Sequence, residues 1–218
     1  MASAHGIVFL VDVDNTLLDN DRVTADLRRF LSAEMGEKRE ESYFAIFEEL
    51  RAELGYADYL GALQRYRVQN PHDSHILKAS SFLIDYPFAN RLFPQSLDAV
   101  DRMKELGRPV ILTDGDAVFQ QRKIERSGLL ETFEGHALVY IHKEDELADV
   151  ERRYPAERYV LMDDKLRILA AIKAQWGERV TTVFVRQGHY AVDPDVTARY
   201  PAADISLERI GDVVGLEF

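Results

Sequence analysis

Two aspartates stand two positions apart at the end of an apolar run. Residues 7–11 are apolar, and Asp12 and Asp14 come directly after them. Residues two apart in an extended segment face the same side, so we expect both carboxylates to point toward one site. One carboxylate of such a pair can attack phosphorus while the other handles the proton of the leaving group. The same residues also fit a strand end followed by an Asx turn.

Two polar clusters follow later apolar runs. Thr113 and Asp114 come after residues 110–112, and their hydroxyl and backbone N–H groups can hold phosphate oxygens if a helix begins there. Lys143 comes after residues 137–141 and can neutralise both a phosphate and a nucleophile. Each cluster alone also has a structural explanation, as a helix N-cap for the first and as a solvated lysine for the second.

A pair of adjacent acids, Asp163 and Asp164, follows a fourth apolar run. Mg²⁺ prefers one or two carboxylates together with water and phosphate oxygens, so this pair is a natural site for a hard cation. Acids at the start of a helix are also favoured by the helix dipole, and the pair alone does not separate the two explanations.

The elements that must position these residues alternate along the chain. Short apolar runs are followed by segments of helical periodicity, which is typical of a parallel sheet with helices around it. Helices are expected from Pro94 to Gly107, over about residues 117–127, and after Asp164. The expected strands cover residues 7–13, 110–113, 137–141, 159–162, 182–185 and 205–207. All four polar clusters then lie at the carboxyl edge of the sheet, where open α/β sheets bind ligands.

Residues 20–90 interrupt the alternation. Apolar residues there recur three and four apart, with no strand pattern, which predicts about four helices inserted after the first strand. We therefore expect an α/β core domain of residues 1–19 and 91–218, with a Rossmann-like parallel sheet, and an all-helical cap domain of residues 20–90.

The overall composition limits the classes of function. The chain has 218 residues and a formal net charge of -11, which disfavours nucleic acid as a partner. It contains no cysteine, so disulfides and thiolate chemistry are excluded. The apolar run before Asp12 is too short for a signal core or a membrane span, so we expect a cytoplasmic protein without a membrane partner, as a monomer or homodimer.

The order of the clusters resembles that of one family. A carboxylate pair, a threonine, a lysine and a second acid pair follow successive strands, with a helical insert after the first. In this the chain is similar to the haloacid dehalogenase superfamily, and residues 20–90 look like that superfamily's first-type cap. The resemblance covers essentially the whole chain. It places the first strand at the centre of the sheet, between the strands that precede Thr113 and Asp163.

The resemblance implies a role for each matching residue. Asp12 matches the nucleophile, and Asp14 the general acid and base that also offers its backbone carbonyl to Mg²⁺. The implied catalytic residues are Asp12, Asp14, Thr113 and Lys143; the implied phosphate ligands are Asp12, Thr113, Asp114 and Lys143; and the implied metal ligands are Asp12, Asp14, Asp163 and Asp164. The resemblance thus implies a Mg²⁺-dependent phosphatase that hydrolyses a small phosphorylated metabolite through an aspartyl-phosphate.

Two positions depart from the family pattern, and several alternatives stay open. Glu144 follows the lysine where the family commonly has proline, and Arg167 stands four residues beyond Asp163, where a second acid is common. Lys123 is a weaker candidate for the lysine role. True dehalogenases of the superfamily lack the second aspartate, so Asp14 favours phosphoryl transfer. A phosphomutase, a phosphonatase and a phospho-accepting signalling module without turnover remain the alternatives.

Overall fold

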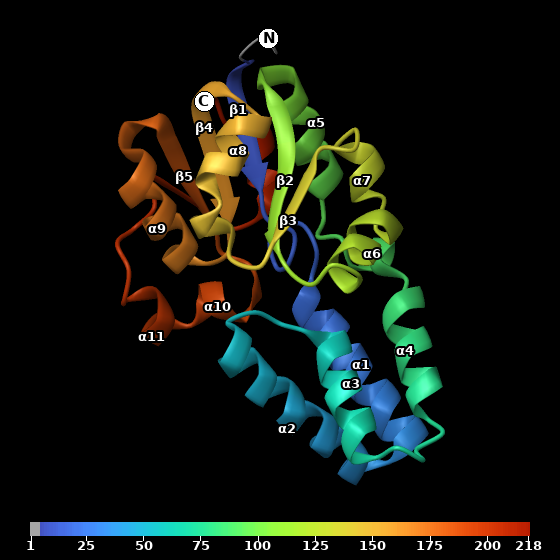
Figure 1. Cartoon of the computed structure of the whole chain (residues 1–218). Coiled ribbons are helices and arrows are strands. Elements are labelled where there is room, and N and C mark those ends of the chain that lie inside the picture. Colours follow the sequence, from blue (N-terminus) through green and yellow to red (C-terminus); the bar gives the residue numbers. More distant parts are fainter. Residues whose placement is uncertain (1–4) are drawn as a thin grey trace.

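A six-stranded sheet forms the upper part of the molecule in Figure 1. The computed structural model describes residues 5–218. All strand pairs are parallel, in the order β3-β2-β1-β4-β5-β6. The strands are β1 (His5–Val11), β2 (Arg108–Asp114), β3 (Ala137–Tyr140), β4 (Ala156–Asp163), β5 (Val180–Val185) and β6 (Ile205–Leu207). The predicted fold class is confirmed, and β1 lies between β2 and β4 as the family resemblance implied.

Apolar side chains on the two faces of the sheet pack into two separate clusters. Val8 and Leu10 face one cluster, and Phe9 and Val11 face the other, as the alternation of a strand requires. Helices α8 (Leu147–Arg153) and α9 (Leu166–Trp176) cover the first face. The second face is covered by α5 (Ser96–Leu106), α6 (Phe119–Arg126) and α7 (Leu129–Thr132). The sheet is therefore buried on both sides, which explains its continuous apolar runs.

Some element ends differ from the predicted ones for identifiable reasons. β1 ends at Val11 rather than at residue 13, because the carbonyl oxygen of Val13 accepts bonds from the N–H groups of residues 16, 17 and 18 in a tight turn. α5 begins at Ser96 rather than at Pro94, because Gln95 has a left-handed conformation, with φ 63°, that cannot belong to the helix. The Phe93 N–H and the Ser96 hydroxyl both donate to Leu17 O and hold this turn against the segment after β1.

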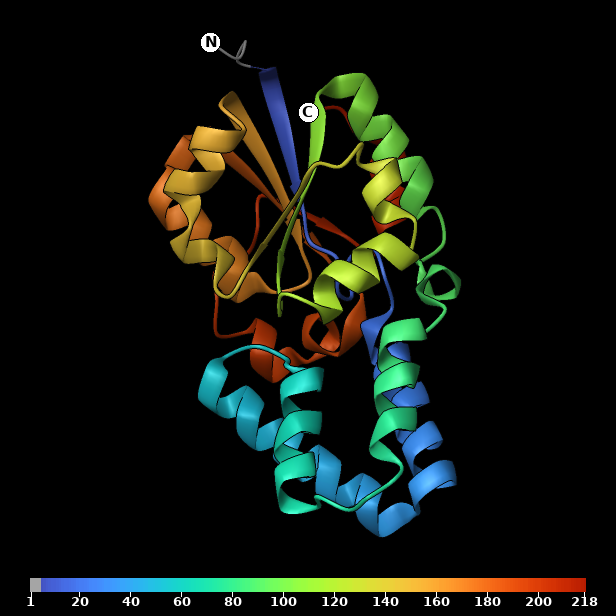
Figure 2. The same cartoon turned by 45° about the vertical axis from the view of Figure 1, so that its right-hand side comes forward.

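Four helices separate β1 from the rest of the sheet, as predicted. They are α1 (Asn20–Met35), α2 (Glu37–Leu54), α3 (Tyr59–Gln69) and α4 (Ile76–Asp85). Figures 1 and 2 place them beyond the carboxyl ends of the strands, in the lower part of both views. We call these helices the helical insert. The remaining short elements are α10 (Gly188–Val192), α11 (Pro194–Thr197) and the 3₁₀ turns Phe88–Arg91, Lys143–Asp145, Gly177–Arg179 and Ile210–Gly215.

The chain enters and leaves the helical insert through two neighbouring segments. Leu18 and Leu92 form an antiparallel bridge, and the Asp19 N–H donates to Arg91 O at 2.7 Å. Arg91 also pairs with the buried Asp26 of α1. We call residues 17–19 and 91–93 the linker pair. Whether the insert is a domain with bounds at 20 and 90 stays a prediction.

Among residues 5–218, no helix combines the length and apolar character that a bilayer crossing needs.

Candidate active site

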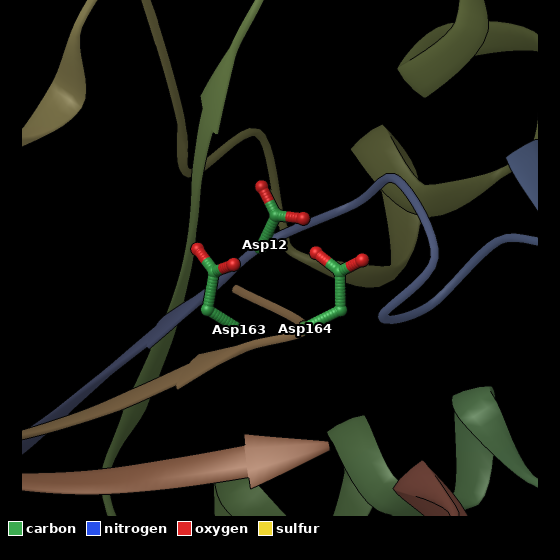
Figure 3. A group of neighbouring side chains, drawn as sticks. All are labelled: Asp12, Asp163 and Asp164. Atoms are coloured by element: carbon green, nitrogen blue, oxygen red, sulfur yellow. The ribbon is translucent and has the colours of Figure 1, made fainter. Parts of the chain in front are cut away.

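Three aspartates meet at the carboxyl edge of the sheet. Asp12 follows β1, Asp163 ends β4 and Asp164 comes directly after it. Because β1 and β4 are neighbouring parallel strands, their ends lie side by side. All three side chains are buried, and one carboxylate oxygen of each lies within 4.8 Å of the others. Figure 3 shows the three carboxylates directed toward the same space.

Lys143 joins this group from the loop after β3. Its Nζ lies 2.6 Å from Asp12 Oδ1 and 2.6 Å from Asp163 Oδ2, and it donates to Leu112 O at 3.2 Å. Burial alone would lower the pKa of Lys143, but Asp12, Asp163 and the nearby Asp114 outweigh it and hold that pKa well above its ordinary value. Lys143 is therefore a permanent positive charge beside the expected nucleophile.

The aspartate group has more negative charge than its protein partners satisfy. Neither carboxylate oxygen of Asp164 has a hydrogen-bond partner within residues 5–218. Burial, together with Asp163 and Asp12, raises the pKa of Asp164 well above its usual range. Buried carboxylates without partners are costly unless a cation compensates them. Three convergent carboxylates are the ligand type that Mg²⁺ prefers, so the residues fit this ion.

Lys165 is a basic residue near the group that the sequence interpretation missed. Burial would lower its pKa, but Asp164, Asp12 and Asp163 raise it above its ordinary value. Its Nζ also lies 5.5 Å from the centre of the Tyr190 ring. Its position directly after the acid pair was the only signal for it in the sequence.

Thr113 and Asp114 end β2 beside the aspartate group. Thr113 is buried, and its Oγ1 accepts a bond from Gln120 Nε2 at 2.9 Å. Asp114 Oδ1 accepts the backbone N–H of Lys143 at 2.7 Å and so fixes the loop that carries the lysine. Burial raises the pKa of Asp114 to about 6, with Lys143 opposing the shift. The phosphate contacts expected for these residues stay predictions.

Asp14 is held apart from the three clustered aspartates. Its two carboxylate oxygens accept bonds from Lys123 Nζ at 2.6 and 2.7 Å. The neighbouring Asn15 has φ 61°, a left-handed conformation that turns the chain back after Asp14. Asn15 Oδ1 then accepts the first two N–H groups of α1, those of Asn20 and Asp21, at 3.0 and 3.1 Å. Lys143 therefore contacts Asp12, whereas Lys123 contacts Asp14.

A family model described as haloacid dehalogenase-like hydrolase matches residues 8–183. A solved haloacid dehalogenase-like hydrolase from Burkholderia xenovorans LB400 is 58% identical, with a TM-score of 0.95, over 98% of this chain and 100% of that one. The chain belongs to the haloacid dehalogenase-like hydrolases. It is therefore an enzyme of the hydrolase class. None of the curated proteins searched matches it.

Two other solved structures share the fold of this haloacid dehalogenase-like hydrolase. L-2-haloacid dehalogenase from Xanthobacter autotrophicus is 19% identical, with a TM-score of 0.61, over 95% of this chain and 96% of that one. The HAD-hydrolase YfnB from Bacillus subtilis, in a structure described as bound to magnesium, is 14% identical, with a TM-score of 0.63, over 96% of this chain and 97% of that one. At such identities these likenesses concern the fold alone.

The two departures from the family pattern contact each other in this hydrolase. Arg167 Nη1 lies 2.5 Å from Glu144 Oε1, and Gln175 Nε2 donates to Glu144 O at 3.0 Å. Glu144 and Arg167 thus join the loop after Lys143 to α9. Arg167 therefore pairs with Glu144 rather than with Asp12, Asp163 or Asp164.

The helical insert of the hydrolase contacts the core close to the site. A Cβ built on Gly55, between α2 and α3, would lie only 2.9 Å from Cε1 of His142, the residue before Lys143. On the other side, His189 Nδ1 lies 2.6 Å from Asp21 Oδ1 at the start of α1. The His189 ring thus joins the segment after β5 to the first turn of α1.

Proposed function

We propose that this hydrolase is a Mg²⁺-dependent phosphatase that acts on a small phosphate monoester. The observation that carries the proposal is the buried group of Asp12, Asp163 and Asp164, in which Asp164 lacks a hydrogen-bond partner within the described chain. Such a group requires a cation, and a cation beside a carboxylate nucleophile suits an anionic phosphate. Asp14, which dehalogenases of the superfamily lack, supports the same conclusion.

Asp12 is the nucleophile of the proposed reaction. One of its carboxylate oxygens forms a bond to phosphorus, and the bond from phosphorus to the leaving oxygen breaks. Asp14 gives its proton to that leaving oxygen and is left as a carboxylate. Asp14 then takes a proton from water as the water oxygen attacks phosphorus. The acyl-phosphate bond breaks, phosphate leaves and the Asp12 carboxylate is restored.

Lys143 orients Asp12 and balances charge throughout this cycle. Its contact with Asp12 Oδ1 limits rotation of the carboxylate, and its positive charge offsets that of the incoming phosphate. Asp12, Asp163 and Asp164, with the backbone carbonyl of Asp14, would hold Mg²⁺. When bound, Mg²⁺ supplies charge neutralisation for the phosphate and the carboxylates.

The helical insert supports a small substrate. It contacts the core on two sides of the site, through Gly55 at His142 and through Asp21 at His189. A lid in this position excludes water and leaves little room for a macromolecular substrate. We therefore propose a small soluble phosphorylated metabolite as the substrate.

Release of inorganic phosphate from a panel of phosphorylated metabolites tests the function. We expect turnover with Mg²⁺ and none in excess chelator. The same panel should include L-2-chloro acids and phosphonates, with halide and phosphonate cleavage measured. Halide release without phosphate release would overturn the proposal in favour of a dehalogenase, and transfer of phosphate between sugar hydroxyls would identify a mutase.

A further inference from the structure

Lys123 is a fully buried lysine on α6, outside the group around Asp12. It is 0% exposed, and its ammonium lies 5.1 Å from the centre of the Phe119 ring. Removing an ammonium from water is costly, so a lysine in this position needs a full set of partners. The partners of Lys123 therefore show whether its ammonium can also bind a substrate.

The three donors of the Lys123 ammonium have three acceptors. Two are the carboxylate oxygens of Asp14, at 2.6 and 2.7 Å, and the third is Asn20 Oδ1 at 3.0 Å. An ammonium carries only three N–H groups, so none remains for a phosphate. Lys123 is thus not a substitute for Lys143, although the sequence left that role open.

The bond to Asn20 connects Asp14 to the helical insert. Asn20 is the first residue of α1, and its Nδ2 lies 3.4 Å from the hydroxyl of Tyr59 on α3. That hydroxyl is also 2.7 Å from Thr24 Oγ1. The Tyr59 ring packs 5.0 Å from Phe119, on the same helix as Lys123. The chain of contacts therefore runs from Asp14 through Lys123 into two helices of the insert.

We propose that Lys123 is a positioning residue that fixes the Asp14 carboxylate and ties it to the helical insert through Asn20. The inference rests on the proposed function, in which Asp14 protonates the leaving oxygen. Asp14 stands in a turn with its side chain 22% exposed, and bonds to both oxygens from one buried ammonium restrict its rotation. A proton donor must be held within hydrogen-bond reach of its target.

Leaving groups that differ in their need for a proton test the inference. p-Nitrophenolate leaves without protonation, whereas the alkoxide of an alkyl phosphate does not. We expect Lys123→Met to lower kcat/KM for an alkyl phosphate by about 10²-fold or more, and for p-nitrophenyl phosphate by about 10-fold or less. Lys173→Met is the matched control, because Lys173 of α9 also pairs with an aspartate, Asp204, at 2.9 Å. This variant should leave the ratio of the two kcat/KM values unchanged.

An equal loss on both substrates, or no loss on either, would overturn the positioning role. If Lys123→Met does not fold, Lys123→Gln is measured by the same criterion, because it keeps an N–H donor without the charge. A crystal structure of the variant that folds gives a readout independent of activity. We expect its Asp14 side chain to leave the position described here, and an unmoved side chain would also contradict the proposal. If the wild-type protein hydrolysed no phosphate ester, the phosphatase function would be refuted instead. The crystal structure of the variant would still show whether Lys123 fixes the Asp14 side chain.

Discussion

At the scale of single residues, the site separates two aspartates that stand only two positions apart. Asp12 contacts Lys143 within the buried group, while Asp14 contacts Lys123 at the border with the insert. The two carboxylates thus pair with two different lysines. Their replacements should therefore have different kinetic consequences.

Asp12→Asn should reduce turnover to background, because the amide keeps the shape of the side chain but lacks the negative charge that makes a carboxylate oxygen nucleophilic. Asp14→Asn should still accept phosphate from a substrate with a very good leaving group but release it about 10²–10⁴-fold more slowly. Rapid-quench labelling followed by mass spectrometry of the Asp12 peptide measures the trapped adduct. Label on residue 14, or near-normal activity of Asp12→Asn, would contradict these roles.

Asp114 should make folding stability depend on pH. Its pKa is raised from 3.8 to about 6 in the folded protein. Between these values the folded state binds more protons at this carboxyl than the unfolded state, so the free energy of unfolding falls as pH rises. The resulting penalty is fully present above about pH 6.

Asp114→Asn removes this penalty while its amide oxygen can still accept the Lys143 N–H. We expect the variant to gain on the order of 1 kcal/mol or more over wild type at pH 7.5, and much less at pH 4. Urea unfolding at both pH values measures the difference. A gain that does not change with pH would show that ionisation of Asp114 is not its source.

At the scale of elements, α9 and the loop after β3 are joined by the contact between Arg167 and Glu144. Glu144 is 8% exposed and its Oε2 lacks a hydrogen-bond partner within residues 5–218, so it depends on this contact. Because the side chain of Arg167 is 46% exposed, solvent weakens the interaction. The pair nevertheless holds the backbone that carries Lys143.

Arg167→Gln should lower the free energy of unfolding by on the order of 1 kcal/mol, because it leaves a buried carboxylate without its partner. Combining it with Glu144→Gln should recover most of that loss. Chemical denaturation of the two single variants and the double variant gives the coupling energy. Arg186→Gln, in an exposed pair with Glu208, is the control and should have a smaller effect. Additive losses in the double variant would rule out the coupling.

The strands and the residues at their ends could be predicted from sequence because the relevant signals are local. An apolar run and the polar residue that follows it identify Asp12, Thr113, Lys143 and Asp163 together with their edge of the sheet. The partner of Asp14 could not be predicted in the same way. Lys123 lies 109 positions away, on a helix whose rotation about its axis decides whether it meets Asp14. The pairing of Glu144 with Arg167 likewise depends on how α9 packs.

At the scale of the whole molecule, the aspartate group should link Mg²⁺ binding to global stability. At about 100 times its dissociation constant, an ion that binds only the folded state adds about 2.7 kcal/mol. For a chain of this size we expect Mg²⁺ to raise the Tm by about 5–10 °C. Asp164→Asn should raise the Tm without metal, because it removes a buried acid that has no hydrogen-bond partner within residues 5–218 and whose ionisation burial opposes. The same change should abolish most of the rise with Mg²⁺.

Thermal unfolding with Mg²⁺ and with chelator measures both effects. Asp101→Asn provides the control, because its side chain is 69% exposed and pairs with Lys104 on α5. It should respond to Mg²⁺ as wild type does. A full Mg²⁺ response in Asp164→Asn would place the ion elsewhere.

The linker pair also bears on how this enzyme can diversify. Leu18 and Leu92 are bridged, so the points where the insert begins and ends are neighbours in space. Recombination that deletes, lengthens or replaces residues 20–90 would leave the two cut ends where a short turn can rejoin them. The sheet and its aspartates would be inherited unchanged. We therefore expect substrate choice to change by exchange of the insert, provided that the new segment again offers Lys123 an acceptor in the place of Asn20.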